Sequence, residues 1–538
     1  GNLTVELVVD KSINKFKGVY IPFYLIFRIL GIATDKEIFQ HITYTDTTTT
    51  SKKMLDIISN SFKSKYGHFD NCLGVHDVGE VIKLIYNKTK STNKKQEEEN
   101  NIMISTQRAY ILDIIDKNFL PHIGFDPVDR SKKARFLGHL IHETLLLLIC
   151  KDQNIIKSTD RDAYDTKRVS DAGTSLTKVF KRNFNSSIVQ PIRTKIRSDL
   201  KNASFLQVNL RNSIENAIRE TDLTKAMRQA IIAGAKTTTI KQQELTYRLT
   251  SQQLQEKNQL NVISHLRGIE TPGASSAKKD VRSDEMRRVH PTFIGFICPV
   301  QSADSGERVG MEKQMALNAT LTGIGSKSIL LDKLLQDKNH PIIPLDDNIS
   351  LEDIESDEKY AKVFVNGDWV GLTKKSPVFL QYWRNMRRQS KIHIHTGISY
   401  IDARDHIYFD VDYGRMIAPF LIVYRDDKGV QDIKLTRKHI KQLSRRELDI
   451  DQLVKEQIVE YITPEERINC LVAPSYSELW KQRKSTIVDY THCEIPQAIL
   501  GLPALTSPYP DHNQAPRNVF QTQQVKQTCG WFSVGWYD

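Results

Sequence analysis

The chain has 538 residues, of which 39% are hydrophobic and 26% charged, and its formal net charge is +12. This length excludes a single hydrophobic core, so we expect several domains, and the composition indicates a globular, soluble protein. The positive charge favours an anionic partner such as nucleic acid, although charge alone does not determine the fold.

Six cysteines are scattered singly and no CxxC pair is present. We therefore expect neither a structural zinc site nor a disulfide framework, which suits a reducing, intracellular environment. The first residues lack an initiator Met and the basic, apolar pattern of a secretory signal. From this start we expect the chain to begin within a longer protein.

The first segments alternate between strand and helix patterns. Val5–Asp10 alternates like a strand, and the next apolar stretch predicts a helix that stops at Gly31. Thr34 is placed to cap the following helix. Thr45–Lys53 is predicted to be a polar loop.

Most of the first half predicts helix. Helical patterns cover Ile111–Cys150, Ser175–Ile214 and the region Arg228–Leu254. Within the first of these, Leu137–Cys150 is too short and too polar for a membrane span and indicates a buried helix. Asn87–Asn101 is charged and low in complexity, which indicates a mobile insertion without an evident function.

The pattern changes after about Thr271. Gly273–Arg288 is a basic loop rich in Gly and Ser, and short β-rich pieces follow: FIGFICPV, KVFVNGDWVGL, IYFDVDYGR and FLIVYRD. Asn366-Gly367 is a strong two-residue hairpin signal. The predicted fold is a multidomain α+β protein, mostly helical first and β-rich afterwards.

Two short constellations have the residue types of metal ligands. His393 and His395 would lie on one face of a strand, but no third ligand is visible, so a surface strand is the favoured interpretation. Asp410 and Asp412 form a DxD, for which a hairpin edge is favoured. No P-loop and no nucleophile elbow is present.

Two other stretches suit contact with phosphate. Arg384, Arg387 and Arg388 predict one basic helical face, either solvated or facing phosphates. Tyr509–Gln527 combines an arginine and a lysine with seven amides. Such side chains suit phosphates, sugars and base edges, although a plain polar loop is the alternative.

Several blocks together resemble the second-largest subunit of multisubunit DNA-directed RNA polymerases, of the eukaryotic, archaeal and large-DNA-virus type. They are IFRILGIATDKEIFQHITY, DRDAYDTKRVSDAGTSLTKVFKR, ISHLRGIETP, HPTFIGFICPVQSADSGERVGMEKQMAL, KVFVNGDWVGL, DYGRMIAPFLIVYRD and THCEIPQAILGLPALTSPYPDHNQAPRNVFQTQQVKQ. They occur in the family's order and cover nearly all of the chain. The resemblance implies these modules: 1–170 lobe, 171–235 second segment of the protrusion, 236–322 fork, 323–400 first external module, 401–475 second external module and 476–538 start of an incomplete hybrid-binding domain.

The resemblance assigns roles to single positions. In the family the arginine of DHNQxPRN, here Arg517, reaches the triphosphate of the incoming nucleotide. Gln514 and Gln527 match positions that hold the RNA end of the hybrid, with Asn513 and Lys526 beside them. The guanidinium can stabilise charge on departing pyrophosphate, and amides can hold the hybrid without reading its sequence.

The fork blocks give further candidates and also depart from the family pattern. Arg267, Arg287 and Arg288 are candidate DNA contacts. Where the family carries an ETPEG block, Gln301 replaces the first glutamate and Asp304 keeps the second acid as a candidate substrate contact. Gly268 stands where an arginine is common. These changes indicate a divergent lineage.

The resemblance also implies an assembly. Expected partners are the largest subunit, small subunits, template DNA, nascent RNA, nucleoside triphosphates and a polypeptide that supplies the C-terminal half of the subunit. Mg²⁺ would be held mainly by the largest subunit, and no metal ligand and no zinc are expected in this chain. The protein would be located inside the cell, in the nucleus or the cytoplasm. The alternative is a non-catalytic nucleic-acid-binding scaffold that retains the fold.

Overall fold

The computed structural model forms two compact units, each built from two stretches of the chain. Unit 1 comprises Gly1–Arg161 and Ile324–Asp412, and unit 2 comprises Asp162–Gly323 and Tyr413–Asp538. The structure describes residues 4–7, 19–44, 49–63, 79, 82, 104–150, 160–202, 210–219, 223–225, 227–228, 253–270, 284–306, 308–345, 360–374, 377–495 and 499–528.

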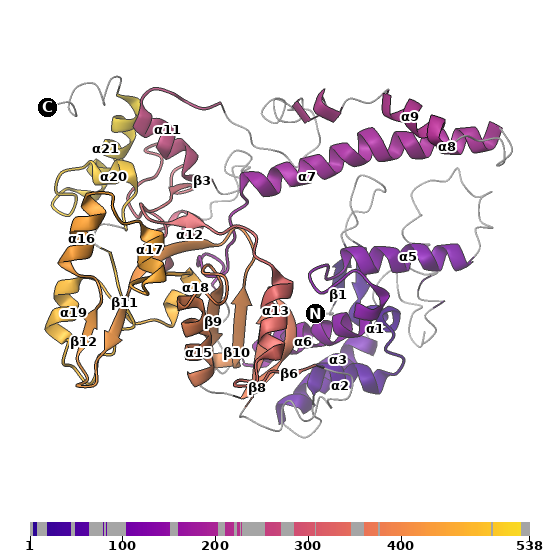
Figure 1. Cartoon of the computed structure of the whole chain (residues 1–538). Helices are drawn as coiled ribbons and strands as arrows, with labels where there is room; N and C mark the ends of the chain where they lie inside the picture. Colours follow the sequence, from indigo (N-terminus) through magenta and orange to yellow (C-terminus); the bar gives the residue numbers. More distant parts are fainter. Residues whose placement is uncertain are drawn as a thin grey trace. The chain divides into compact units, whose positions relative to one another are not determined.

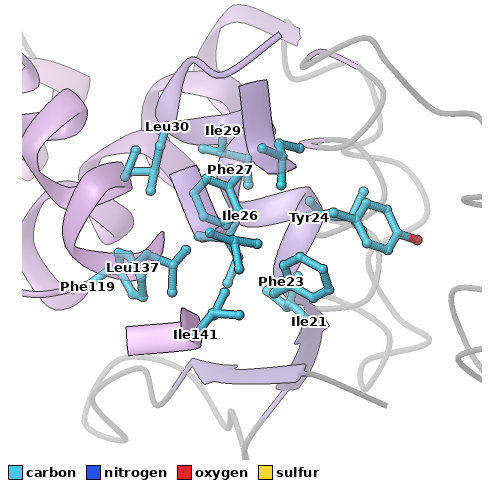
Figure 2. Packing of buried hydrophobic residues seen from close by; sticks show 14 of the residues in the cluster. Ile21, Phe23, Tyr24, Ile26, Phe27, Ile29, Leu30, Phe119, Leu137 and Ile141 are labelled. Carbon is cyan, nitrogen blue, oxygen red and sulfur yellow. The ribbon is translucent and has the colours of Figure 1, made fainter. Parts of the chain in front are cut away.

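The first stretch of unit 1 is mainly helical. Strands β1 (Thr4–Leu7) and β2 (Val19–Pro22) pair antiparallel, and five helices follow: α1 (Phe23–Leu30), α2 (Asp35–Thr43), α3 (Thr49–Lys63), α5 (Ile104–Asn118) and α6 (Arg130–Cys150). The apolar side chains of α1 are buried all round and pack with Phe119, Leu137 and Ile141 (Figure 2). This core fixes α1 against α6.

The second stretch of unit 1 forms a five-stranded sheet in the order β6-β8-β7-β10-β9. Its strands are β6 (Ile343–Pro344), β7 (Tyr360–Val365), β8 (Asp368–Lys374), β9 (Gly397–Ile401) and β10 (His406–Asp410). Helices α13 (Lys327–Gln336) and α15 (Pro377–Arg388) lie beside the sheet (Figure 1). They share one hydrophobic core with it through leucine and aromatic side chains. β10 runs parallel to β7 and antiparallel to β9.

Unit 2 begins with helices and short pairings. It contains α7 (Ala172–Phe184), a π-helical turn (Asn185–Val189), α8 (Gln190–Asn202), α9 (Leu210–Arg219), α11 (Gln259–Leu266) and α12 (Asp284–Arg287). The short strands β3 (Gly268–Glu270) and β4 (Glu312–Gln314) pair antiparallel.

A six-stranded sheet forms the rest of unit 2. The ten-residue strand β11 (Met416–Arg425) pairs with β5 (Thr320–Leu321), β12 (Gln431–Ile433), β13 (Val459–Ile462) and β15 (His492–Cys493), and β14 (Val472–Ala473) pairs with β15. Five helices surround or follow the sheet: α16 (Arg437–Ser444), α17 (Ile450–Lys455), α18 (Pro464–Ile468), α19 (Tyr476–Gln482) and α20 (Leu502–Leu505). The last element described is α21 (Ala515–Gln527).

The structure confirms the expected α+β character and several local predictions. α1 ends at Gly31, whose φ is +105°, and Thr34 forms a capping box with Glu37. Asn366 and Gly367 both have positive φ and join β7 to β8 as the hairpin signal predicts. Strand β1 overlaps the first predicted strand at Val5–Leu7. Helices α5 to α9 overlap the two predicted helical regions, although α5 begins before Ile111 and α9 continues past Ile214.

Four local predictions are wrong. The segment predicted as a loop over Thr45–Lys53 enters α3 at Thr49. FIGFICPV forms turns with one isolated bridge, Ile297 to Met315, because its apolar side chains fill a core rather than a sheet face. His393 and His395 lie in a turn, where the His395 N–H donates to His393 Nδ1. Asp410 ends β10 and no hairpin follows, since β11 belongs to another sheet.

The predicted basic face of α15 is also wrong in one position. Arg387 is only 2% exposed, and its Nη1 donates to the Thr396 carbonyl at 2.8 Å. Its guanidinium therefore closes the turn after the helix and does not face solvent. Asn87–Asn101, most of Arg228–Leu254 and most of Gly273–Arg288 lie outside the described residues; the last ends in α12. Among described helices, none combines the length and apolar character needed to cross a bilayer.

Close packing of α6 on α2 gives a first prediction. A Cβ at Gly138 would lie 2.3 Å from the His41 carbonyl oxygen, so Gly138→Ala must push the two helices apart. We expect a loss of about 1–3 kcal/mol in the free energy of unfolding, measured by chemical denaturation. Gly323→Ala is the control, because a Cβ there meets no atom within 4 Å. Equal stability of both variants would contradict the packing argument.

A buried ion pair in unit 2 gives a pH prediction. His492 Nε2 lies 2.6 Å from Glu460 Oε1, and both side chains are nearly inaccessible. Burial alone would lower the pKa of His492, but hydrogen bonds with Cys470 and Glu460 and the charge of Glu460 raise it to about 9.

Because the folded pKa lies above the ordinary value of about 6.5, the charged imidazole stabilises the fold fully below that pH. This contribution is lost as the pH rises through about 9. We expect the melting temperature of the wild-type chain to fall over that interval, and the fall to be smaller in His492→Gln. An identical pH profile for both proteins would exclude the pair as its source.

Candidate nucleic-acid interface

Two asparagines, the buried Asn518 and the exposed Asn513, shape the loop that leads into α21. Asn518 is 5% exposed; its Nδ2 donates to the Pro510 carbonyl at 2.7 Å and its Oδ1 accepts from Asn513 Nδ2 at 3.2 Å. Asn513 Nδ2 also donates to the Pro508 carbonyl at 3.0 Å. The two amides thereby tie the polar loop to the first turn of the helix, where Pro516 is favourable.

The inner face of α21 is held by neighbouring segments of unit 2. Asn518, Thr522 and Val525 are buried, and α11 packs against the helix. Asn258, which caps α11, donates its Nδ2 to the carbonyls of Val525 at 2.8 Å and Thr528 at 2.7 Å. These bonds satisfy carbonyls at the C-terminal end of α21 and fix its orientation.

The outer face of α21 presents a row of polar side chains. Arg517, Gln524 and Gln527 are exposed, with the half-exposed Phe520 between them. Residues three, seven and ten positions apart fall on one broad helix face, so the row extends about 15 Å along the axis. Gln514, the N-cap, is exposed where the row begins. The helix therefore offers one cation and several amides along a single face.

Lys526 lies on another side of α21. Burial lowers its pKa, while the charges of Glu312 and Asp304 act in the opposite direction. The negative charge of Asp304 therefore acts on the Lys526 ammonium group in the structure. Gln523, three residues before Lys526, donates its Nε2 to the Ser302 carbonyl at 2.5 Å and so joins α21 to the loop that contains Asp304.

Two of the arginines predicted to contact DNA donate to backbone carbonyls of their own unit. Arg267 Nη2 donates to the carbonyls of Ala316 at 2.6 Å and Ala319 at 2.9 Å, and burial lowers its pKa. Arg287 Nη1 donates to the Val309 carbonyl at 2.5 Å, whereas Arg288 is exposed. Arg288 therefore has the greater access to an external anion.

Gln301 occupies a buried network of amides. It is 4% exposed, and its Nε2 donates to Ser264 Oγ at 2.9 Å and to Gln314 Oε1 at 3.3 Å. Gln314 Nε2 in turn donates to the Ser264 carbonyl at 3.0 Å, which fixes the orientation of its amide. A neutral side chain with a donor fits here, which explains why this position holds an amide.

Three family models match separate parts of the chain. They are RNA polymerase Rpb2, domain 2, over residues 12–170, domain 3 over 252–321, and domain 4 over 363–424. Together the matched ranges cover more than half of the sequence. The chain belongs to the RNA polymerase second-largest subunit family.

Curated members of this family align with nearly the whole chain. DNA-directed RNA polymerase II subunit RPB2 of Encephalitozoon cuniculi is 28% identical over 520 residues, covering 96% of this chain and 41% of the relative. DNA-directed RNA polymerase subunit Rpo2 of Sulfolobus acidocaldarius is 28% identical, covering 95% and 41%. DNA-directed RNA polymerase II subunit 2 of Arabidopsis thaliana is 27% identical, covering 95% and 40%. The chain spans about two fifths of the length of these relatives.

Family resemblance pointed to the exposed row of α21 but not to the side chains that support it. Asn258, Asn518 and Gln523 anchor the helix through backbone carbonyls. Asn518 stands inside the PRN motif, so the motif itself was a signal for it. Asn258 precedes an apolar helical pattern, which is an N-cap signal, but its bonds to α21 join distant segments and leave no local trace.

The amide network predicts the effect of restoring the family's glutamate. Gln301→Glu would remove the donor to Ser264 and place a buried carboxylate against Gln314 Oε1. We expect a loss of about 1–3 kcal/mol in the free energy of unfolding at neutral pH, smaller in acid where the carboxyl is protonated. Exposed Gln524→Glu is the matched control and should be nearly neutral. A stable Gln301→Glu protein would refute the role given to this donor.

Proposed function

We propose that this chain is part of the second-largest subunit of a DNA-directed RNA polymerase and helps to form its active-centre cleft. The reaction is transfer of a nucleotide from a nucleoside triphosphate to the RNA 3′ end, directed by template DNA. The observation that carries the proposal is the exposed row of α21, which includes Arg517 in the first turn, on a helix anchored by the amides of Asn513 and Asn518. Assembly with the largest subunit, small subunits and the remaining part of this subunit completes the enzyme.

Arg517 is proposed to act on the triphosphate. Its guanidinium is exposed on a helix whose first turn is tied to the preceding loop, so the cation is presented with little freedom of the backbone. A fixed cation lowers the energy of charge that develops on pyrophosphate as it leaves. Gln514, Asn513 and Gln527 would hold the RNA end of the hybrid through ribose and phosphate oxygens, with Lys526 close to the same backbone.

Mg²⁺ would be supplied by residues outside this chain. Among the described residues, one group of three or more metal-ligating side chains comes together, and it contains two histidines and one glutamate. Mg²⁺ prefers oxygen ligands and retains several waters, so this group does not suit it. The residues of this chain therefore contribute fixed charge and hydrogen bonds, and no step here passes through the metal.

The finer organisation is also proposed from the family. Residues 1–170 would form the lobe, 171–235 part of the protrusion, 236–322 the fork, 323–475 the two external modules and 476–538 the start of the hybrid-binding domain. Arg288, with Arg267 and Arg287 beside it in the fork, would lie near DNA. The enzyme would act inside the cell, in nucleus or cytoplasm.

The decisive test is Arg517→Ala in the assembled polymerase. On an RNA–DNA scaffold we expect single-nucleotide extension to slow by about 10²-fold or more, since removal of one transition-state donor typically has this effect. Scaffold binding should change little, because the lost contact is to the triphosphate. Arg437→Ala, an exposed arginine on α16, is the control and should extend normally.

The alternative function is a non-catalytic scaffold that binds nucleic acid with the same fold. It predicts that Arg517→Ala and Arg437→Ala behave alike in extension. If the Arg517→Ala enzyme extended RNA at the wild-type rate, the proposed role of this residue would be wrong. Absence of extension in the wild-type complex, with scaffold binding intact, would favour the alternative.

A further inference from the structure

Three potential metal ligands meet inside unit 1, away from α21 in the sequence. His139 and Glu143 are one helical turn apart on α6, and His406 is the first residue of β10. One ligand atom from each side chain lies within 4.8 Å of the others. His139 is 4% exposed, His406 is 1% exposed, and the Glu143 side chain is 17% exposed.

Each imidazole is held on its outer side by a tyrosine hydroxyl. Tyr44 Oη lies 3.2 Å from His139 Nδ1, and Tyr408 Oη lies 3.1 Å from His406 Nδ1. A hydroxyl that accepts the Nδ1–H fixes the tautomer in which Nε2 carries the lone pair. Histidines that bind metals are oriented by such second contacts.

The inner nitrogen of His406 lacks a hydrogen bond within the described part of the chain. His406 Nε2 is buried, and its nearest carboxylate oxygen, Glu143 Oε1, is 3.7 Å away, beyond hydrogen-bonding distance. Buried polar atoms normally have a partner, so an atom left in this state points to a bound group. The carboxylate that faces it has a second oxygen, Oε2, which lies 3.5 Å from Arg404 Nη1.

The side chains in and around the cluster narrow the choice of ion through the donor atoms that they supply. Arg404 and Lys362 face it, and Lys362 Nζ lies over the rings of Tyr44 and Trp369 at 4.9 and 5.4 Å. His142 stacks obliquely on Tyr44. Mg²⁺ and Ca²⁺ need several oxygen ligands, whereas this cluster supplies one carboxylate and two imidazoles. An ion that forms strong bonds to imidazole nitrogen is favoured instead.

We propose that His139 Nε2, His406 Nε2 and Glu143 Oε1 bind one Zn²⁺ ion, with the fourth tetrahedral position left for water. Two imidazoles and one carboxylate are an ordinary zinc ligand set. The ion would tie α6 to β10 and so join the two stretches of chain that make unit 1. This inference does not depend on the proposed polymerase activity, and it revises the expectation that the chain holds no zinc.

The test measures metal content and stability of the full chain. Purified wild-type protein, dialysed against metal-free buffer, should retain about one Zn²⁺ per chain, measured by inductively coupled plasma mass spectrometry. Removal by a strong chelator should lower the melting temperature, and added Zn²⁺ should restore it. Co²⁺ in place of Zn²⁺ should give the visible absorption of a tetrahedral site.

Variants assign the ion to this cluster. Glu143→Gln, which keeps the side-chain shape, and His406→Gln should both lose the bound Zn²⁺. Tyr408→Phe should retain it with about 10–100-fold lower affinity, because only the orienting contact is lost. The double variant His393→Gln/His395→Gln is the control, since it removes two imidazoles that lie outside the cluster, one exposed and one half-buried, and leaves the cluster intact.

The proposal is overturned if wild-type protein holds no Zn²⁺ and neither chelator nor added Zn²⁺ changes its melting temperature. This result does not depend on whether any variant folds. It is also overturned if the ion is lost in the His393→Gln/His395→Gln control while Glu143→Gln keeps it, which would mean an adventitious ion only. Loss in Glu143→Gln with retention in the control supports it.

Discussion

The hydrogen-bonding requirement of strand β11 organises unit 2. A buried strand must satisfy its backbone polar groups on both edges, and along its ten residues β11 does so with β5, β13, β15 and β12 in turn. These partners come from widely separated parts of the sequence. β15 then leads into the segment that contains α21, and the Leu317 N–H donates to the Leu500 carbonyl at 2.8 Å. The position of the polar helix face is thus a consequence of how one strand completes its ladder.

Neutral amides do most of the anchoring beneath that face. Asn258, Gln301 and Asn518 are hydrogen-bonded to carbonyls or hydroxyls inside unit 2. An amide costs less to bury than a carboxylate or an ammonium group, and it both donates and accepts. Arg517, by contrast, lies on the exposed face of α21. An exposed guanidinium on a helix held in place by amides is an arrangement that can bind phosphate.

Local signals in the sequence predicted local structure well. The Asn366-Gly367 turn, the stop at Gly31 and the cap at Thr34 each depend on a few neighbouring residues, and all are confirmed. The strand predicted for FIGFICPV is wrong because a short apolar run does not reveal whether its side chains pack in a sheet or in a core formed by turns. The exposed position predicted for Arg387 is wrong. Helical periodicity places Arg387 on the face of Arg384, but its guanidinium is buried and donates to the Thr396 carbonyl, which lies beyond the helix. For the candidate site, family resemblance identified Arg517 and its neighbours, while the supporting contacts needed coordinates.

The cluster in unit 1 shows the same limit at its sharpest. His139 and Glu143 stand four residues apart in a helical pattern, so the sequence already places them on one face. Two ligands at that spacing are common in ordinary helices and do not define a site. The third ligand, His406, lies close to them only because β10 pairs in parallel with β7. The orientation of its ring depends on Tyr408, two residues further along the same strand. Parallel pairing is a long-range event that no local pattern encodes. Metal sites whose ligands are split between a helix and a distant strand are therefore invisible to spacing rules, and they become apparent when a buried nitrogen is found without its hydrogen bond.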